Sequence, residues 1–99
     1  MVVKHAATAG TLESSDAMVT IEPAAAGIDI FIESPVIHQF GKQIRRIALA
    51  EINGLGIENV KLTIVDKGAL DCTLRARIEC AAYRAADMVQ DSIPWGGGI

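Results

Sequence analysis

Residues 58–78 read ENVKLTIVDKGALDCTLRARI, a clear strand pattern followed by an ambiguous one. Residues 60–64 alternate between apolar and polar side chains, which is typical of a strand with one buried face. Residues 70–78 also alternate throughout, yet their larger apolar members are four positions apart, as on a helix: Leu70, Leu74 and Ile78. The stretch therefore predicts either a strand followed by a helix or a hairpin of two strands.

Register favours the hairpin. A three-residue loop at residues 66–68 would use Gly68 in the left-handed conformation that such loops require. It would also place apolar residues opposite one another on the same face: Ile64 and Leu70, Leu62 and Cys72, Val60 and Leu74. A helix beginning at Lys67 would lose this match. We therefore expect a second hairpin here, followed by a closing helix in the alanine-rich run from Glu79 onward.

A helix is predicted upstream of this stretch, over residues 34–56. Ser34 followed by Pro35 is a typical start signal, because serine can cap free amides and proline has no amide to leave unpaired. Gly54 or Gly56 supplies the end. The spacing of its apolar residues predicts one buried face: Ile37, Phe40, Ile44, Ile47 and Ala48.

Two alternating runs, residues 17–22 and 28–33, precede that helix and predict a first antiparallel hairpin. The fold class is therefore α+β, with element order ββαββα: a small antiparallel sheet of two β-hairpins with helices packed on one face. We expect a single domain over residues 1–99. It comprises a flexible leader at 1–15, the α+β body at 16–90 and a flexible glycine-rich tail at 91–99.

Composition narrows the function classes. The 99 residues are 51% hydrophobic with only four aromatic residues, so the core is aliphatic. A net charge of −3 provides no positive field for a phosphate backbone, and we expect no nucleic-acid partner. With no signal peptide and no apolar span, we expect a cytoplasmic protein without a membrane partner. Cys72 and Cys80 are expected to be reduced and buried, because nothing in their spacing suggests zinc or a disulfide framework.

No catalytic set is predicted from the side chains. His5 falls in the leader and His38 on the polar side of a helix, and both are interpreted as surface residues. Acidic residues are scattered over turns and exposed faces, and no nucleophile has a base nearby in the sequence. We expect no metal site and no active site within this chain.

The stretch AGTLESSD, residues 9–16, places two serines between acidic residues, just ahead of the first strongly apolar segment. Ser14 and Ser15 could form a turn or cap. Alternatively, a hydroxyl on an exposed segment could be the substrate of a modifying enzyme, since such a serine needs access rather than activation. The residues alone leave both interpretations open.

Together, AGTLESSD and the later DKGALDCTLRAR closely resemble the acyl carrier protein of citrate lyase, the gamma subunit of that enzyme. The resemblance covers nearly the whole chain. It implies that Ser14 carries, through a phosphodiester, covalently attached 2'-(5''-phosphoribosyl)-3'-dephospho-coenzyme A. Ser15 offers the same hydroxyl one position away. The arm's thiol would carry acetyl and citryl thioesters during cleavage of citrate to oxaloacetate and acetate.

The implied partners are the citrate lyase alpha (acyl transferase) and beta (citryl lyase) subunits and the arm-transferring enzyme, a holo-carrier synthase. The Asp-Ser-Leu/Met motif of the helical-bundle acyl carriers is absent, so the resemblance implies a different carrier fold. The residues from Asp66 to Arg77 are assigned no chemistry. Two alternatives are the acyl carrier subunit of malonate decarboxylase and an unmodified α+β interaction module.

Overall fold

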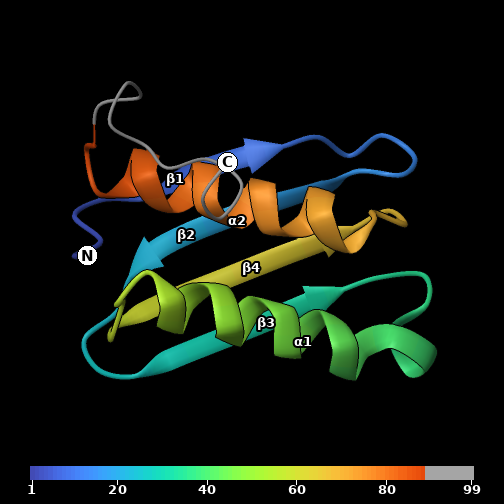
Figure 1. The fold of residues 1–99 in the computed structure, drawn as a ribbon, viewed down its shortest axis with the longest axis horizontal. Helices are drawn as coiled ribbons and strands as arrows, with labels where there is room; N and C mark the ends of the chain where they lie inside the picture. The colour runs from blue at the N-terminus through green and yellow to red at the C-terminus, as the bar shows by residue number, and fades with distance from the viewer. Residues whose placement is uncertain (89–99) are drawn as a thin grey trace.

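The computed structural model describes residues 1–88 and shows one four-stranded mixed sheet with two helices on one face (Figure 1). The elements are β1 (Ala7–Gly10), β2 (Ala17–Pro23), β3 (Ile28–Glu33), α1 (Ile37–Gly54), β4 (Val60–Asp66) and α2 (Asp71–Ala85). The α+β class is confirmed, and the fold is not a helical bundle. Neither helix of this described part is long and apolar enough to cross a membrane. The predicted tail at 91–99 lies outside the described residues.

The predicted pairing of the strands is wrong. The sheet order is β1-β2-β4-β3, so β4 lies between the two strands expected to form the first hairpin. It pairs antiparallel with β2, where Val19 faces Ile64, and parallel with β3, where Ile30 faces Leu62. The reason is the connection through α1: two neighbouring strands joined by a helical crossover run parallel.

The predicted second hairpin is also wrong, because residues 71–85 form α2. Both edges of β4 are occupied by β2 and β3, so no position beside it remains for another strand. Leu74 and Ile78 instead belong to a buried helical face that continues through three alanines: Ala81, Ala82 and Ala85. Gly68 does adopt a positive φ of 90°, as expected, but its turn leads into a helix.

The leader is more ordered than predicted. Residues 7–10 form the edge strand β1, which pairs antiparallel with β2 so that Ala9 faces Val19. Val3 and Ala9 are buried. The hairpin at the N-terminus of this fold is therefore β1–β2, and only residues 11–16 remain as the loop between these strands.

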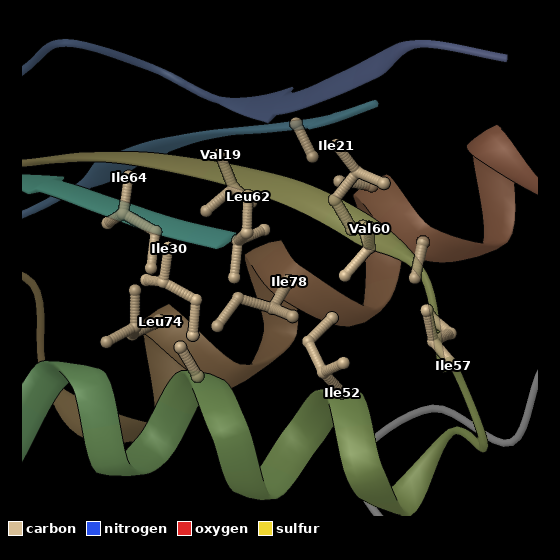
Figure 2. Packing of buried hydrophobic residues seen from close by; sticks show 14 of the residues in the cluster. Val19, Ile21, Ile30, Ile52, Ile57, Val60, Leu62, Ile64, Leu74 and Ile78 are labelled. Atoms are coloured by element: carbon tan, nitrogen blue, oxygen red, sulfur yellow. The ribbon is translucent and has the colours of Figure 1, made fainter. Parts of the chain in front are cut away.

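The aliphatic core lies between the sheet and the helices. Figure 2 shows side chains from β2, β3 and β4 meeting those of both helices; the largest fully buried ones are Ile21, Ile52, Leu62, Ile64 and Ile78, with Val19 and Val60. The predicted buried face of α1 holds for Ile44, Ile47 and Ala48 but not for Phe40, which is 42% exposed. Phe40 lines a surface groove near the start of α2 instead of entering the core.

Candidate functional site

The loop Thr11–Asp16 joins β1 to β2 at one end of the sheet (Figure 1). The starts of α1 and α2 lie at the same end. Ser14 and Ser15 are both exposed, and neither hydroxyl makes a hydrogen bond with any residue of 1–88. The loop thus presents two serine hydroxyls to solvent at one end of the sheet.

Gly10 sets the direction in which the chain enters this loop. Its φ is +96°, a backbone conformation that residues other than glycine rarely adopt. A Cβ at this position would lie 1.8 Å from the backbone oxygen of Ala17 and 3.2 Å from Cδ of Arg77. The close approach of the two strands at the base of the loop therefore requires glycine.

Asp16 closes the loop from its other end. The Thr11 hydroxyl donates to Asp16 Oδ2 at 2.7 Å, and the backbone N–H of Ala17 donates to Asp16 Oδ1 at 2.7 Å. Thr11 Oγ1 in turn accepts the Glu13 N–H at 3.2 Å. These bonds hold the two ends of the loop together.

Arg77 of α2 anchors the same carboxylate to the helical layer. Its Nε donates to Asp16 Oδ1 at 2.9 Å and its Nη2 to Oδ2 at 3.1 Å, a two-point ion pair. The bonds from Arg77, then those from Thr11 and Ala17, hold the pKa of Asp16 well below its usual range. The bond to Asp16 likewise raises the pKa of Arg77. Asp16 is therefore a structural anion with little basicity.

A third attachment comes from the connection between β4 and α2. The Ser15 N–H donates to the Lys67 carbonyl at 2.8 Å, and the Lys67 N–H donates to the Asp16 carbonyl at 2.9 Å. Ser15 has a φ of +66°, so this bond holds it in a left-handed conformation. The backbone is fixed at Ser15, whereas Ser14 next to it forms no backbone hydrogen bond with the described residues.

The supporting loop is itself held by the buried carboxylate of Asp66. Asp66 Oδ1 accepts the N–H groups of Gly68 at 3.2 Å and Ala69 at 2.9 Å, while Oδ2 accepts the Ser34 hydroxyl at 2.8 Å. Ser34 therefore ties the start of α1 to β4. The predicted cap is displaced: the N-cap of α1 is Val36, whose N–H donates to Ser34 Oγ at 3.2 Å.

The other candidate residues lie away from this loop or do not support chemistry. His5 Nε2 bonds Asp87 Oδ1 at 2.5 Å beyond the end of α2, and its bonds to the Ala6 carbonyl and to Asp87 raise its pKa. His38 is exposed on α1. Cys72 is exposed on α2 and Cys80 is half-buried against the core, so the expectation that both are buried is wrong. Within residues 1–88, no three His, Cys, Asp or Glu side chains gather as a metal would require.

Sequence reasoning singled out the two serines, which stay a predicted site, but did not identify the residues that hold their loop. Asp16, Lys67 and Arg77 hold the loop, and the last two lie in the stretch to which no role was assigned. A signal was present, since DKGALDCTLRAR was one of two stretches that carried the resemblance. The structure brings these two stretches together.

A family model described as "ACP: Malonate decarboxylase delta subunit (MdcD)" matches residues 4–85. The class of protein is thus that of the acyl carriers, which bear a covalently attached prosthetic group. An exposed, unengaged serine on a braced loop fits such an attachment.

Three similar proteins, each named citrate lyase acyl carrier protein, narrow the class. The protein of Lacticaseibacillus casei is 55% identical over 87 residues, covering 88% of this chain and 86% of that protein. That of Fusobacterium nucleatum is 54% identical over 88 residues, 88% of this chain and 94% of the relative. That of Edwardsiella ictaluri is 50% identical over 97 residues, 96% of each. The chain belongs to the citrate lyase acyl carrier protein family.

Proposed function

We propose that this protein is the acyl carrier subunit of citrate lyase and that Ser14 is its attachment residue. The observation that carries the proposal is the exposed Ser14 hydroxyl, which is engaged by no residue of 1–88, on a loop fixed on both sides. The loop offers a modifying enzyme a hydroxyl whose position does not depend on folding of a disordered segment. Family membership supplies the role.

The loop geometry favours Ser14 over Ser15. The backbone of Ser15 is left-handed and held by Lys67, so presenting its side chain differently would require breaking that bond. Ser14 has no such constraint. The Ser14 hydroxyl can therefore enter a transferase site, where the phosphodiester would form, without disturbing the connection between the loop and β4.

The group we propose is phosphoribosyl-dephospho-coenzyme A, which supplies a thiol that carries acetyl and citryl groups. This chain contributes the tether. Attachment to a rigid body raises the local concentration of the thiol at the sites of the alpha and beta subunits. We assign no catalytic step to this chain; within the loop, the carboxylate of Asp16 is already engaged by Arg77.

The test compares Ser14→Ala with Ser15→Ala, each coexpressed with the arm-transferring enzyme. Intact mass and peptide mapping locate the arm, and reconstitution with alpha and beta subunits measures citrate cleavage. We expect Ser14→Ala to lose both the added mass and turnover, while Ser15→Ala keeps a modified peptide and measurable activity. Modification of Ser14→Ala but not of Ser15→Ala would move the site to Ser15. Citrate cleavage by the unmodified chain alone would contradict the carrier role.

A second candidate is the acyl carrier subunit of malonate decarboxylase, because the matching family model carries that description. Exchange of partners separates the two. The modified protein should restore turnover to the alpha subunit of citrate lyase and not to that of malonate decarboxylase. The reverse result would favour the second candidate.

A further inference from the structure

A groove of about 710 Å³ lies between the N-terminal parts of α1 and α2. This volume is in the range of roughly 300–1,000 Å³ typical of small-molecule sites. Its lining is largely aliphatic and aromatic: Val36, Phe40, Ile44, Ala69, Leu70 and Leu74. The groove therefore has the size and the chemistry of a site for a partly apolar ligand.

Three large apolar side chains of this lining are exposed: Leu70 by 69%, Phe40 by 42% and Val36 by 36%. Apolar side chains scattered singly over a surface need no explanation, but several gathered around one hollow mark a binding site. The core does not need these residues, because Ile44 and Leu74 beneath them are already buried.

The groove adjoins the attachment loop. The Lys67 carbonyl accepts the Ser15 N–H, and the next two residues, Gly68 and Ala69, line the groove. Figure 1 shows the β1–β2 loop and the starts of both helices at one end of the molecule. A flexible group on Ser14 thus begins beside this groove and not across the protein from it.

The groove also contains polar acceptors. Gln43 of α1 donates from Nε2 to both carboxylate oxygens of Asp71 on α2, at 3.2 and 3.0 Å. The side-chain oxygen of Gln43, Oε1, makes no hydrogen bond within residues 1–88. The Asp71 carboxylate has lone pairs for further donors. Acceptors beside an apolar wall suit a ligand that combines amide N–H groups with methyl groups.

We propose that this groove holds the pantetheine part of the arm on Ser14 between visits to partner subunits. The inference rests on the proposed function. Pantetheine is uncharged, with two methyl groups for the wall of Phe40 and Leu70 and two amide N–H groups for Gln43 and Asp71. Covalent attachment raises its effective concentration, so even weak contacts fill the site. Occupancy shields the thiol from solvent.

The test begins with amide NMR spectra of the unmodified and the arm-bearing protein, after mass mapping has established that Ser14 is modified. We expect shifts at the attachment loop and also at the groove, in Phe40, Gln43, Ala69 and Leu70. Shifts confined to residues 11–16 would overturn the groove proposal while leaving the carrier function intact. Absence of the arm would instead count against the proposed function.

Alkylation of the arm thiol provides a second readout, resolved from Cys72 and Cys80 by peptide mapping. We expect the thiol to react roughly threefold or more slowly than free pantetheine, since a site filled most of the time leaves the thiol free only for the remainder. Phe40→Gln should bring the rate close to that of pantetheine. The matched control is Phe31→Gln, because Phe31 is 56% exposed but lies in β3 and does not line the groove.

Equal alkylation rates for wild type, both variants and free pantetheine would contradict the proposal. Groove signals that stay unchanged in the arm-bearing protein but shift on adding the alpha subunit would contradict it as well, and would assign the groove to that partner. The NMR comparison uses only the native sequence, so the proposal remains testable if Phe40→Gln does not fold.

Discussion

Asp16 accepts two hydrogen bonds from Arg77, a residue 61 positions later in the chain, at 2.9 and 3.1 Å. The pair joins the serine loop to α2 and thereby connects the two stretches that carry the family resemblance. The second stretch therefore has a definite role: it holds the segment that carries Ser14.

Arg77→Gln should slow attachment of the arm by roughly tenfold or more, because a loop that is poorly positioned costs rate in the transferase site. It should also lower Tm while leaving the fold intact, since the core contains no part of this ion pair. The measurements are the time course of added mass with the arm-transferring enzyme and a thermal melt.

Arg46→Gln is the control for that variant. Arg46 is an exposed arginine of α1 that forms no hydrogen bond or ion pair within residues 1–88. A surface change of this kind should alter stability by less than about 0.5 kcal/mol and leave the transfer rate unchanged. Equal rates for both variants would mean that the anchor is not needed for attachment.

The pH dependence of stability should report on Asp16. Its pKa is lowered in the folded state, so its contribution is complete above the unfolded value of about 3.9 and is lost as pH falls below it. The free energy of unfolding should therefore differ between wild type and Asp16→Asn by a constant amount from pH 7 to 5. That difference should shrink below about pH 4. Urea titrations at each pH measure this difference in the free energy of unfolding. A difference that widens in acid would contradict a lowered pKa of Asp16 in the folded state.

Gly10→Ala should be costly. Adopting a positive φ costs alanine about 1–2 kcal/mol, and relieving the contact with the Ala17 oxygen adds about 1–3 kcal/mol. Gly27→Ala is the control, because Gly27 has a φ of +81° but no atom within 4 Å of the added Cβ. In urea unfolding, Gly27→Ala should lose only about 1–2 kcal/mol, the cost of a positive φ for alanine. Equal losses in the two variants would mean that the strands separate easily at Gly10.

Glu51→Gln should raise stability at neutral pH. Burial, then the hydrogen bond and charge of Glu79, raise the pKa of Glu51 against the opposing effect of Arg75. Because the folded state favours the protonated acid, the stability from this group is present below its unfolded pKa of about 4.3 and lost as pH rises through the folded value.

The amide introduced by Glu51→Gln also brings a donor close to Glu79, whose Oε2 is a buried oxygen with no partner in the part of the chain described. We expect the free energy of unfolding of Glu51→Gln to exceed that of wild type by up to about 1 kcal/mol at pH 7.5, and we expect this difference to disappear near pH 4. Thermal melts at the two pH values measure it. A variant less stable than wild type at pH 7.5 would show that the ion pair of Glu51 with Arg75 dominates.

The strand and helix patterns of individual segments were predictable where one face is buried. Residues 17–22 and 60–64 bury every second side chain, and Ile44, Ile47 and Ala48 bury the predicted face of α1. The serine loop was found from its polarity and its resemblance. Its anchors could not be found, because a salt bridge between Asp16 and Arg77 leaves no trace in the local spacing of either residue.

The buried faces of residues 17–22 and 60–64, the left-handed turn at Gly68 and the family could all be predicted from the amino-acid sequence, since each depends on residues close together in the chain or on matched motifs. Whether residues 70–78 form a strand or a helix depended on the rest of the fold. Leu70, Leu74 and Ile78 satisfy both a strand period of two and a helical spacing of four, so local pattern cannot separate them. Once the crossover through α1 places β3 against β4, and β2 takes the other edge, no ladder position remains, and burial of Leu74 and Ile78 requires a helix across the sheet.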